Sequence, residues 1–370
     1  MTVPQNRIFG LDVMRAAAIL LVVFDHNADV LGRFIPGVPP GSGIDGVDLF
    51  FVLSGYLIGG ILLKYAAMED VPFRKRALDF WQRRWLRTLP NYYLFLLVNI
   101  VLVHFGMAKG VLNSNTWGYA FFLQNLWKPL DLFFWESWSL VVEEWYYLIF
   151  PAVFFGALFV ARWTVRRTFL LVTLLLITAC TVIRFRMTGA IGSVFELEEG
   201  VRKLAITRMD TIGFGMLAAW LSVYHVRRWE RLRFPLLIIG AVGLALNASL
   251  YGNEHLRYSA TWYFTLGPLA MAALLPALSR WNVTSGIGRP IVFISVVSYA
   301  LYLVHQPLRS VYEVLYEGRS PLVGVLLWIG YWLICFALAW LIYHFWERRF
   351  MLLRGRIGAR ILGDRVTSSA

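Results

Sequence analysis

Residues 11–27 read LDVMRAAAILLVVFDHN, an apolar stretch that nevertheless carries Asp12, Arg15, Asp25 and His26. A helix turns about 100° per residue, so Arg15 and His26 differ by only about 20° around its axis and project from one face, roughly 16 Å apart. Asp12 lies within about 60° of Arg15. Because an ionisable group inside a membrane helix is costly and usually faces a cavity, this stretch predicts a helix that lines a functional site.

Length and composition place the chain among polytopic helical membrane proteins. Of its 370 residues 59% are hydrophobic, and the mean hydropathy is +0.62, whereas soluble domains rarely exceed about half apolar. We expect an all-α fold, with a single membrane-embedded domain over residues 1–350 and a basic cytoplasmic tail over residues 351–370. Ten membrane spans are expected, at roughly residues 9–30, 46–65, 90–106, 138–160, 168–186, 207–225, 234–251, 260–279, 291–312 and 322–345.

The distribution of basic residues predicts the orientation of these spans. The net charge is +13, and most Lys and Arg residues fall in loops on one side of the membrane if the N-terminus is cytoplasmic. We therefore expect both termini in the cytoplasm, and the charge indicates membrane topology rather than nucleic-acid binding. The two cysteines, Cys180 and Cys335, lie in apolar runs, so neither a disulfide framework nor a metal site is predicted.

Two segments do not fit simple spans. Residues 116–127 (TWGYAFFLQNLW) are apolar but too short to cross, which favours an interfacial or re-entrant segment on the outer side. Residues 70–87 interleave basic and aromatic residues, which predicts an amphipathic helix lying on the cytoplasmic surface. Pro90 is expected to break that helix where the third span begins.

A pair of arginines precedes the third span. Arg84 and Arg87 are three residues apart and therefore share one helical face. Clustered guanidinium groups at this position suit a phosphate-bearing ligand that arrives from the cytoplasm. The positive-inside rule explains the same residues without a ligand, so both interpretations stay open.

The fourth span begins with ESWSLVVEEWYY (136–147), which contains two adjacent carboxylates. Glu143 and Glu144 lie about a turn inside its outer boundary. A glutamate at that depth beside an imidazole can hold the ring's tautomer or share its proton. The surrounding aromatics, Trp138 among them, form an interface belt by default, although aromatic rings on the outer side could also stack on sugars.

The second and sixth spans hold further charged residues with two interpretations each. Asp45 and Asp48 lie near the outer end of the second span, and one of them could face the same cavity as His26. Arg208 and Asp210 open the sixth span, either as members of structural ion pairs or as part of a pocket. The second span is also rich in small residues that allow close helix packing, namely the glycines at positions 43, 46, 55, 59 and 60.

The ninth span contains SYALYLVHQP (298–307), in which Ser298, Tyr302 and His305 lie on adjoining turns near the outer end. A lone histidine in such a place is more often a satisfied hydrogen-bonding group than a catalyst. The sequence contains no glycine-rich phosphate loop and no nucleophile elbow.

Taken together and in order, these motifs resemble the acyltransferase-3 family of integral-membrane O-acyltransferases, found mainly in bacteria. Arg349 stands where the family more often has proline, and no further hydrolase-like domain is expected after the last span. The matching segments are the Arg15–His26 spacing, GVDLFFVLSGYLI (46–58), RRWLRTLP (83–90), SWSLVVEEWYY (137–147), RMDTIGFG (208–215), SYALYLVHQP (298–307) and WERRF (346–350).

The resemblance implies a protein of the bacterial cytoplasmic (inner) membrane with ten spans. It implies an acyl-CoA donor, usually acetyl-CoA, as co-substrate with no bound cofactor, and an acceptor hydroxyl on a glycan, glycolipid or secondary metabolite. We favour a cell-envelope or exported polysaccharide or its lipid-linked precursor, and the oligomeric state stays open. The residues expected to bind the donor are Arg84, Arg87, Arg208 and Asp210, and those expected to bind or support the acceptor are Asp12, Asp48, Trp138, Ser298, Tyr302 and His305.

The resemblance also implies that His26 is the central catalytic group and Arg15 its partner. The mechanistic hypothesis is that neutral His26 takes the proton of the acceptor hydroxyl, while Glu143 orients the imidazole. In a variant, His26 itself accepts the acyl group before passing it on. The competing hypothesis is a proton-coupled transporter or flippase of a glycolipid, in which buried acids are equally natural; the absence of an internal repeat disfavours it.

Overall fold

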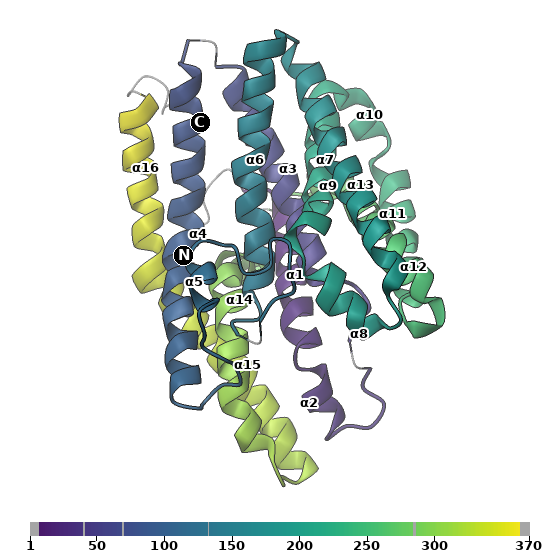
Figure 1. Ribbon diagram of the computed structural model, residues 1–370, viewed down its shortest axis with the longest axis vertical. Helices are drawn as coiled ribbons and strands as arrows, with labels where there is room; N and C mark the ends of the chain where they lie inside the picture. The colour runs from purple at the N-terminus through teal and green to yellow at the C-terminus, as the bar shows by residue number, and fades with distance from the viewer. Residues whose placement is uncertain (1–6, 40, 69, 132, 284–285, 363–370) are drawn as a thin grey trace.

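The computed structural model describes residues 7–39, 41–68, 70–131, 133–283 and 286–362, and every regular element in these ranges is helical. Long helices form the body of the protein (Figure 1), and each overlaps one of the ten predicted ranges. They are α1 (Phe9–Asp25), α3 (Gly46–Ala66), α4 (Phe73–His104), α6 (Ser137–Ala161), α7 (Val165–Met187), α9 (Met209–Tyr224), α11 (Arg233–Ser249), α13 (Tyr263–Leu278), α14 (Arg289–Tyr316) and α15 (Pro321–Ile342).

Shorter helices connect and flank these ten. Helix α15 continues through a π-helical turn, Tyr343–Glu347, into α16, which packs along the first half of α4. The predicted tail therefore begins within α16, and residues 363–370, including Arg365, lie outside the described residues. The shorter helices are α2 (Ala28–Gly32), α5 (Thr116–Ala120), α8 (Val194–Leu197), α10 (Val226–Arg231), α12 (Leu256–Thr261) and α16 (Arg348–Leu362).

Six helical segments among the described residues are long and apolar enough to cross a bilayer: α3, α4, α6, α7, α14 and the continuous segment Pro321–Leu362. A seventh is added if the bent pair Arg233–Ser249 and Asn253–Thr261 counts as one span. Helices α1, α9, α11 and α13 have 16 or 17 residues, about 25 Å, which is less than the roughly 30 Å hydrocarbon core. The protein is thus an all-helical integral membrane protein, and the count of ten spans stays a prediction.

Helix α4 corrects the prediction for residues 70–90. The segment is not a separate surface helix, because one helix runs unbroken from Phe73 to His104 with Pro90 inside it. Proline removes one backbone donor of the helix, and its ring crowds the carbonyl group four residues earlier. Packing against neighbouring helices supports α4 at this point, since α4 contacts α16, α14 and α6, and the Tyr299 hydroxyl donates to the nearby carbonyl oxygen of Thr88 at 2.8 Å.

Helix α1 ends earlier than predicted. It stops at Asp25, and His26 forms its C-cap before the chain turns into α2. The Asn27 amide donates to the Val23 carbonyl at 3.1 Å and to the Tyr331 hydroxyl at 3.0 Å. These bonds hold the turn, and they place the His26 imidazole at a helix end instead of in mid-helix.

The segment 116–127 contains no spanning helix, as predicted. It forms the five-residue helix α5 followed by turns. Its polar side chains anchor it to the helices below: the buried Asn125 amide donates to the carbonyl oxygens of Trp138, at 3.0 Å, and Lys203, at 2.6 Å.

Glycines allow α3 to lie directly against α9 and α1, which confirms their predicted packing role for three of the five. A β-carbon on Gly55 would lie 2.0 Å from the Ile212 carbonyl oxygen, and one on Gly46 would lie 2.5 Å from that of Ala18. A β-carbon on Gly59 would lie 2.6 Å from Ala219 Cβ, whereas nothing lies within 4 Å of one on Gly60. The contact of α3 with α9 therefore depends on backbone-to-backbone approach.

Gly55→Ala is expected to destabilise the protein by about 1–3 kcal/mol, the usual effect of overpacking a close contact. The reason is that the added methyl group meets backbone atoms of α9, which cannot rotate away. The measurement is thermal unfolding of the purified protein in detergent. Gly60→Ala is the matched control on the same helix and should leave the transition unchanged or raise it slightly; equal behaviour of the two variants would contradict the packing argument.

Candidate active site

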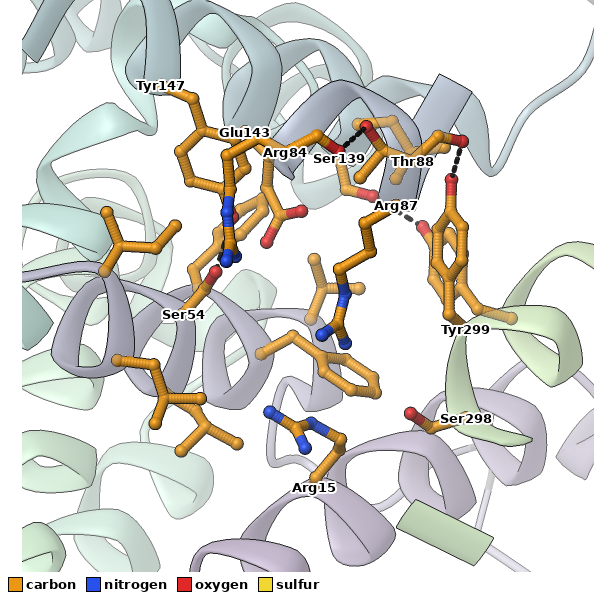
Figure 2. Close-up of a pocket in the computed structure, with 18 residues that line it drawn as sticks. Arg15, Ser54, Arg84, Arg87, Thr88, Ser139, Glu143, Tyr147, Ser298 and Tyr299 are labelled. Atoms are coloured by element: carbon orange, nitrogen blue, oxygen red, sulfur yellow. Dashed lines mark hydrogen bonds between the residues drawn. The ribbon is translucent and has the colours of Figure 1, made fainter. Parts of the chain in front are cut away.

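A pocket rich in arginine lies between α1, α3, α4, α6 and α14 (Figure 2). We call it the basic pocket; its volume is about 110 Å³. Arg15 enters it from α1, and Arg84 and Arg87 enter from α4, so that three guanidinium groups face one space. Glu143 is the one carboxylate among the residues that line it. The pocket therefore has an excess of positive charge and suits an anionic ligand.

The arginines of the basic pocket outnumber the acids beside them. Neither Arg84 nor Arg87 has an ion pair within 4.0 Å in the described part of the chain, and Arg84 Nε is buried without a hydrogen-bond partner. Arg15 lies 4.0 Å from Asp12, whose carboxylate is itself bound by Arg7 Nε at 2.9 Å. Buried guanidinium donors without partners are energetically unfavourable unless a ligand satisfies them.

The two adjacent glutamates of α6 have different surroundings. Glu143 lines the basic pocket, whereas Glu144 accepts a hydrogen bond from Thr88 at 2.6 Å and is not among the lining residues. Ser54 and Tyr147, at 2.5 Å from each other, close the wall beside Glu143. Glu143 has Tyr147 and Ser54 as hydrogen-bonding neighbours, and of the two glutamates it is the one that faces the pocket.

A second pocket, of about 460 Å³, contains His26. We call it the histidine pocket. Its walls include Asp25, which accepts hydrogen bonds from Ser42 N at 2.7 Å and Ser42 Oγ at 2.9 Å. Asp45 and Arg202 form an ion pair at 2.8 Å on another wall. Because these carboxylates already have partners, His26 is the titratable side chain best placed to act on a ligand there.

Asp45 itself is unsuited to proton transfer. Its burial favours the neutral acid, but the neighbouring Arg202 and Arg208 hold the pKa of Asp45 below its usual value, so the carboxylate stays ionised. Asp45 also caps α3 by accepting from Val47 N at 2.9 Å. Its role is to fix the start of α3 and to hold Arg202.

A chain of hydrogen bonds fixes the tautomer of His26. His305 Nδ1 lies 2.5 Å from the Tyr302 carbonyl oxygen, which can only accept, so His305 Nδ1 carries a hydrogen. In the neutral ring His305 Nε2 is then an acceptor, and it lies 2.8 Å from His26 Nδ1. His26 Nδ1 must therefore donate, which leaves His26 Nε2 unprotonated. This nitrogen is the one able to take a proton from a ligand.

The two pockets are neighbours. Val47 lines both, and Tyr302 lines the basic pocket while its carbonyl oxygen holds His305. The Tyr302 hydroxyl is fixed in turn by the Glu136 carbonyl oxygen, at 2.8 Å, and Ser139 Oγ, at 2.7 Å. Val47 and Tyr302 thus form a layer that belongs to the walls of both sites.

This arrangement corrects the predicted partner of His26. Glu143 lies in the basic pocket and not beside His26, whose ring partner is His305 of α14. The sequence marked His305 as a candidate, but a pair separated by 279 residues leaves no spacing signal. Sequence reasoning also missed Ser42 and Arg202 as neighbours of His26, because they come from a loop and a helix end without a motif.

The remaining predicted residues lie around the pockets. Arg208 and Asp48 form a fully buried ion pair, and Arg184 and Asp210 form another at 2.7 Å. None of these four lines the basic pocket, so their contacts match the structural alternative, and donor binding by Arg208 and Asp210 stays a prediction. Ser298 lines the basic pocket.

Trp138 and Asp12 each contact a residue near one of the two pockets. Trp138 is buried, and its ring lies 5.2 Å from the Arg202 guanidinium carbon. Asp12 accepts from Ser295 Oγ at 2.6 Å and lies at the start of α1, far along the helix from His26. Their placement makes Asp12 a support for Arg15 and Trp138 a support for Arg202. No group of three potential metal ligands occurs among the described residues.

Comparisons with known proteins agree with the motifs. The model of the acyltransferase-3 family, described as an acyltransferase domain, matches residues 8–344. The chain is 27% identical over 340 residues to the O-acetyltransferase OatA of Staphylococcus aureus (strain NCTC 8325 / PS 47), covering 84% of this chain and 52% of that protein. It is 26% identical over 337 residues to a putative O-acetyltransferase of S. aureus strain COL, with the same coverage.

The chain spans about half the length of the curated relatives that it matches. No solved structure matches it. The family model, in contrast, covers nearly the whole chain, from the start of α1 to the end of α15, and includes both pockets. On this evidence the protein belongs to the acyltransferase-3 family of membrane proteins.

Proposed function

We propose that the protein transfers an acyl group, most simply acetyl, from acyl-CoA to a hydroxyl group of a cell-envelope or exported glycan or its lipid-linked precursor. The observation that carries this proposal is the pair of neighbouring pockets. One has an excess of guanidinium groups for a phosphate-bearing donor. The other has a histidine whose Nε2 is unprotonated. Family membership and the O-acetyltransferases among its relatives support the reaction class.

The donor is assigned to the basic pocket. A volume of about 110 Å³ holds only part of a CoA molecule, so its narrow pantetheine arm enters while the nucleotide end remains on the cytoplasmic side. Arg84 and Arg87 then meet the phosphates, and Arg15 lies deeper along the arm. The thioester comes to rest near Tyr302 and Val47, the layer next to His26.

In the transfer step, His26 Nε2 takes the proton of the acceptor hydroxyl as its oxygen attacks the thioester carbonyl carbon. The C–S bond then breaks, the CoA thiolate leaves, and the imidazolium returns the proton to the sulfur. His305 holds the ring so that Nε2 faces the reaction. In the covalent variant the same nitrogen accepts the acyl group first and gives it to the acceptor afterwards.

The membrane arrangement is part of the proposal. It places both termini in the cytoplasm of a bacterial inner membrane, the basic pocket toward the cytoplasm and the histidine pocket toward the outer side. Single cysteines introduced at exposed positions test it by labelling with an impermeant maleimide in intact cells. Ser249→Cys, at the end of α11, should react from outside, and Arg162→Cys, at the end of α6, only after permeabilisation.

Purified protein in nanodiscs, incubated with labelled acetyl-CoA and extracted envelope glycan, tests the reaction directly. The expected result is release of CoA that depends on the acceptor, together with label in the glycan. A glycolipid transporter would release no CoA. Rapid quenching and separation of the protein distinguishes the two chemical variants, because only the covalent one leaves labelled acyl groups on the protein when the acceptor is omitted.

Arg87→Gln is expected to raise the KM for acyl-CoA by about 10- to 100-fold, because a charged hydrogen bond of about 1.5–3 kcal/mol is lost. The KM for the glycan should stay unchanged. The matched control is Arg83→Gln on the same helix, since Arg83 pairs with Asp79 at 2.8 Å and does not line the pocket. An unchanged KM for acyl-CoA in Arg87→Gln would remove the donor from the basic pocket.

A further inference from the structure

A third cavity lies apart from the two pockets, between α9, α11 and α13. We call it the apolar groove; its volume is about 890 Å³. Ile239, Leu246 and Leu269 line it and are 61%, 58% and 48% exposed, so it opens onto the apolar surface of the protein. Along α11 its wall consists of Leu232, Leu236, Ile239, Gly243, Leu246, Asn247 and Leu250.

The length of the groove limits what can fill it. Leu232 and Leu250 cap α11 at its two ends, and eighteen steps of 1.5 Å separate them by roughly 27 Å. A phospholipid chain confined to one leaflet reaches only about half of the ~30 Å hydrocarbon core. The groove therefore accommodates an extended hydrocarbon that crosses the bilayer midplane.

One end of the groove lies beside the histidine pocket. Asn247 and Leu250 line the groove, whereas Ala248 and Tyr251, in the same turn at the end of α11, line the histidine pocket. A molecule lying in the groove thus reaches the histidine pocket by passing around one helical turn. Tyr258, which donates to Asn247 Oδ1 at 2.6 Å, supplies the polar edge of the groove at this end.

A cation is present at the same end. Arg257 precedes Tyr258 in α12, is exposed, and forms no ion pair within 4.0 Å with any described residue. Arg257 does not line the groove itself but is next to Tyr258, which does, and an exposed guanidinium group there is complementary to a phosphate that carries a hydrocarbon tail.

We infer that the apolar groove binds the long polyprenyl tail of a lipid-linked acceptor, with its phosphate near Arg257 and its glycan in the histidine pocket. This inference rests on the proposed function and specifies the class of acceptor. It explains why an apolar cavity longer than a leaflet ends at a helical turn that also lines the histidine pocket. The tail holds the acceptor at the membrane and raises its local concentration at His26.

The test uses the full-length protein in nanodiscs and a long polyprenyl phosphate that carries a diazirine in its tail. After irradiation, peptide mapping is expected to place the label on α11 and α13. Excess unlabelled polyprenyl phosphate should compete, and phosphatidylglycerol should not. Ile239→Trp, which fills the groove from an exposed position, is expected to reduce labelling about tenfold.

Ile238→Trp is the matched control, because Ile238 is 65% exposed on the same helix but does not line the groove; it should label like the unmodified protein. Equal competition by phosphatidylglycerol, or equal labelling of both tryptophan variants, would overturn the inference and identify the groove as a site for ordinary bilayer lipid. Acyl-CoA turnover is measured on the same samples. Loss of turnover with labelling intact would count against the proposed reaction alone.

Discussion

His26→Ala is expected to lower the rate of acyl transfer by about 10²- to 10⁴-fold, the range that a positioned general base contributes. The KM for acyl-CoA should change little, because the arginines that bind the donor lie in the other pocket. The measurement is release of CoA at saturating donor, with folding checked by size-exclusion chromatography. Transfer at nearly the unmodified rate would rule out His26 as base or as acyl carrier.

Substitution of His305 tests whether the hydrogen bond to His26 Nδ1 matters for the transfer rate. His305→Phe removes the acceptor that holds His26 Nδ1–H, and His305→Gln restores an acceptor oxygen at a similar position. In a Ser-His-Asp triad, loss of the correct tautomer costs about 10⁴ in kcat; with a neutral partner we expect about 10- to 10³-fold for phenylalanine and partial recovery for glutamine. Equal kcat values for the two variants would show that His305 acts only through packing.

Arg208→Met is expected to destabilise the protein by about 3–5 kcal/mol, because it leaves the buried Asp48 carboxylate without its partner. The measurement is thermal unfolding in detergent. The double variant Arg208→Met/Asp48→Leu removes both charges and should recover most of the lost stability. The amount recovered measures how much of the effect comes from the unpaired charge.

The same variants decide between the two interpretations of Arg208. As a structural residue, Arg208 leaves the KM for acyl-CoA unchanged in the stable double variant. A KM raised as much as in Arg87→Gln would instead return Arg208 to the donor site, which its position outside the basic pocket does not favour.

Helix positions could be predicted because long apolar runs are a local property of the chain. Where tertiary contacts decide, the sequence was misleading. Pro90 was expected to end a helix, but packing of α16 and α14 against α4 keeps it continuous. The end of α1 at Asp25 depends on Asn27 and Tyr331, 304 residues apart, whose hydrogen bond no local pattern reveals.

The site was predicted in parts. Arg15, Arg84, Arg87 and Glu143 come together as charged residues that face a cavity, which the cost of burying charge in a membrane makes foreseeable. Which group holds His26 was not foreseeable. Glutamate and histidine both bind imidazole well, and only the three-dimensional register of α1 against α14 selects His305.

Helix α4 is longer than the hydrocarbon core is thick, so the depth of the basic pocket in the membrane depends on the thickness of the bilayer. Its 32 residues extend roughly 48 Å, against a hydrocarbon core of about 30 Å. Arg84 and Arg87 lie between its charged first half and its apolar second half, so their depth below the headgroups is set by this one helix. A thicker or thinner membrane must be accommodated by tilt or by local deformation of the lipid. The KM for acyl-CoA is therefore expected to vary with the chain length of the surrounding lipid, even when no residue is changed.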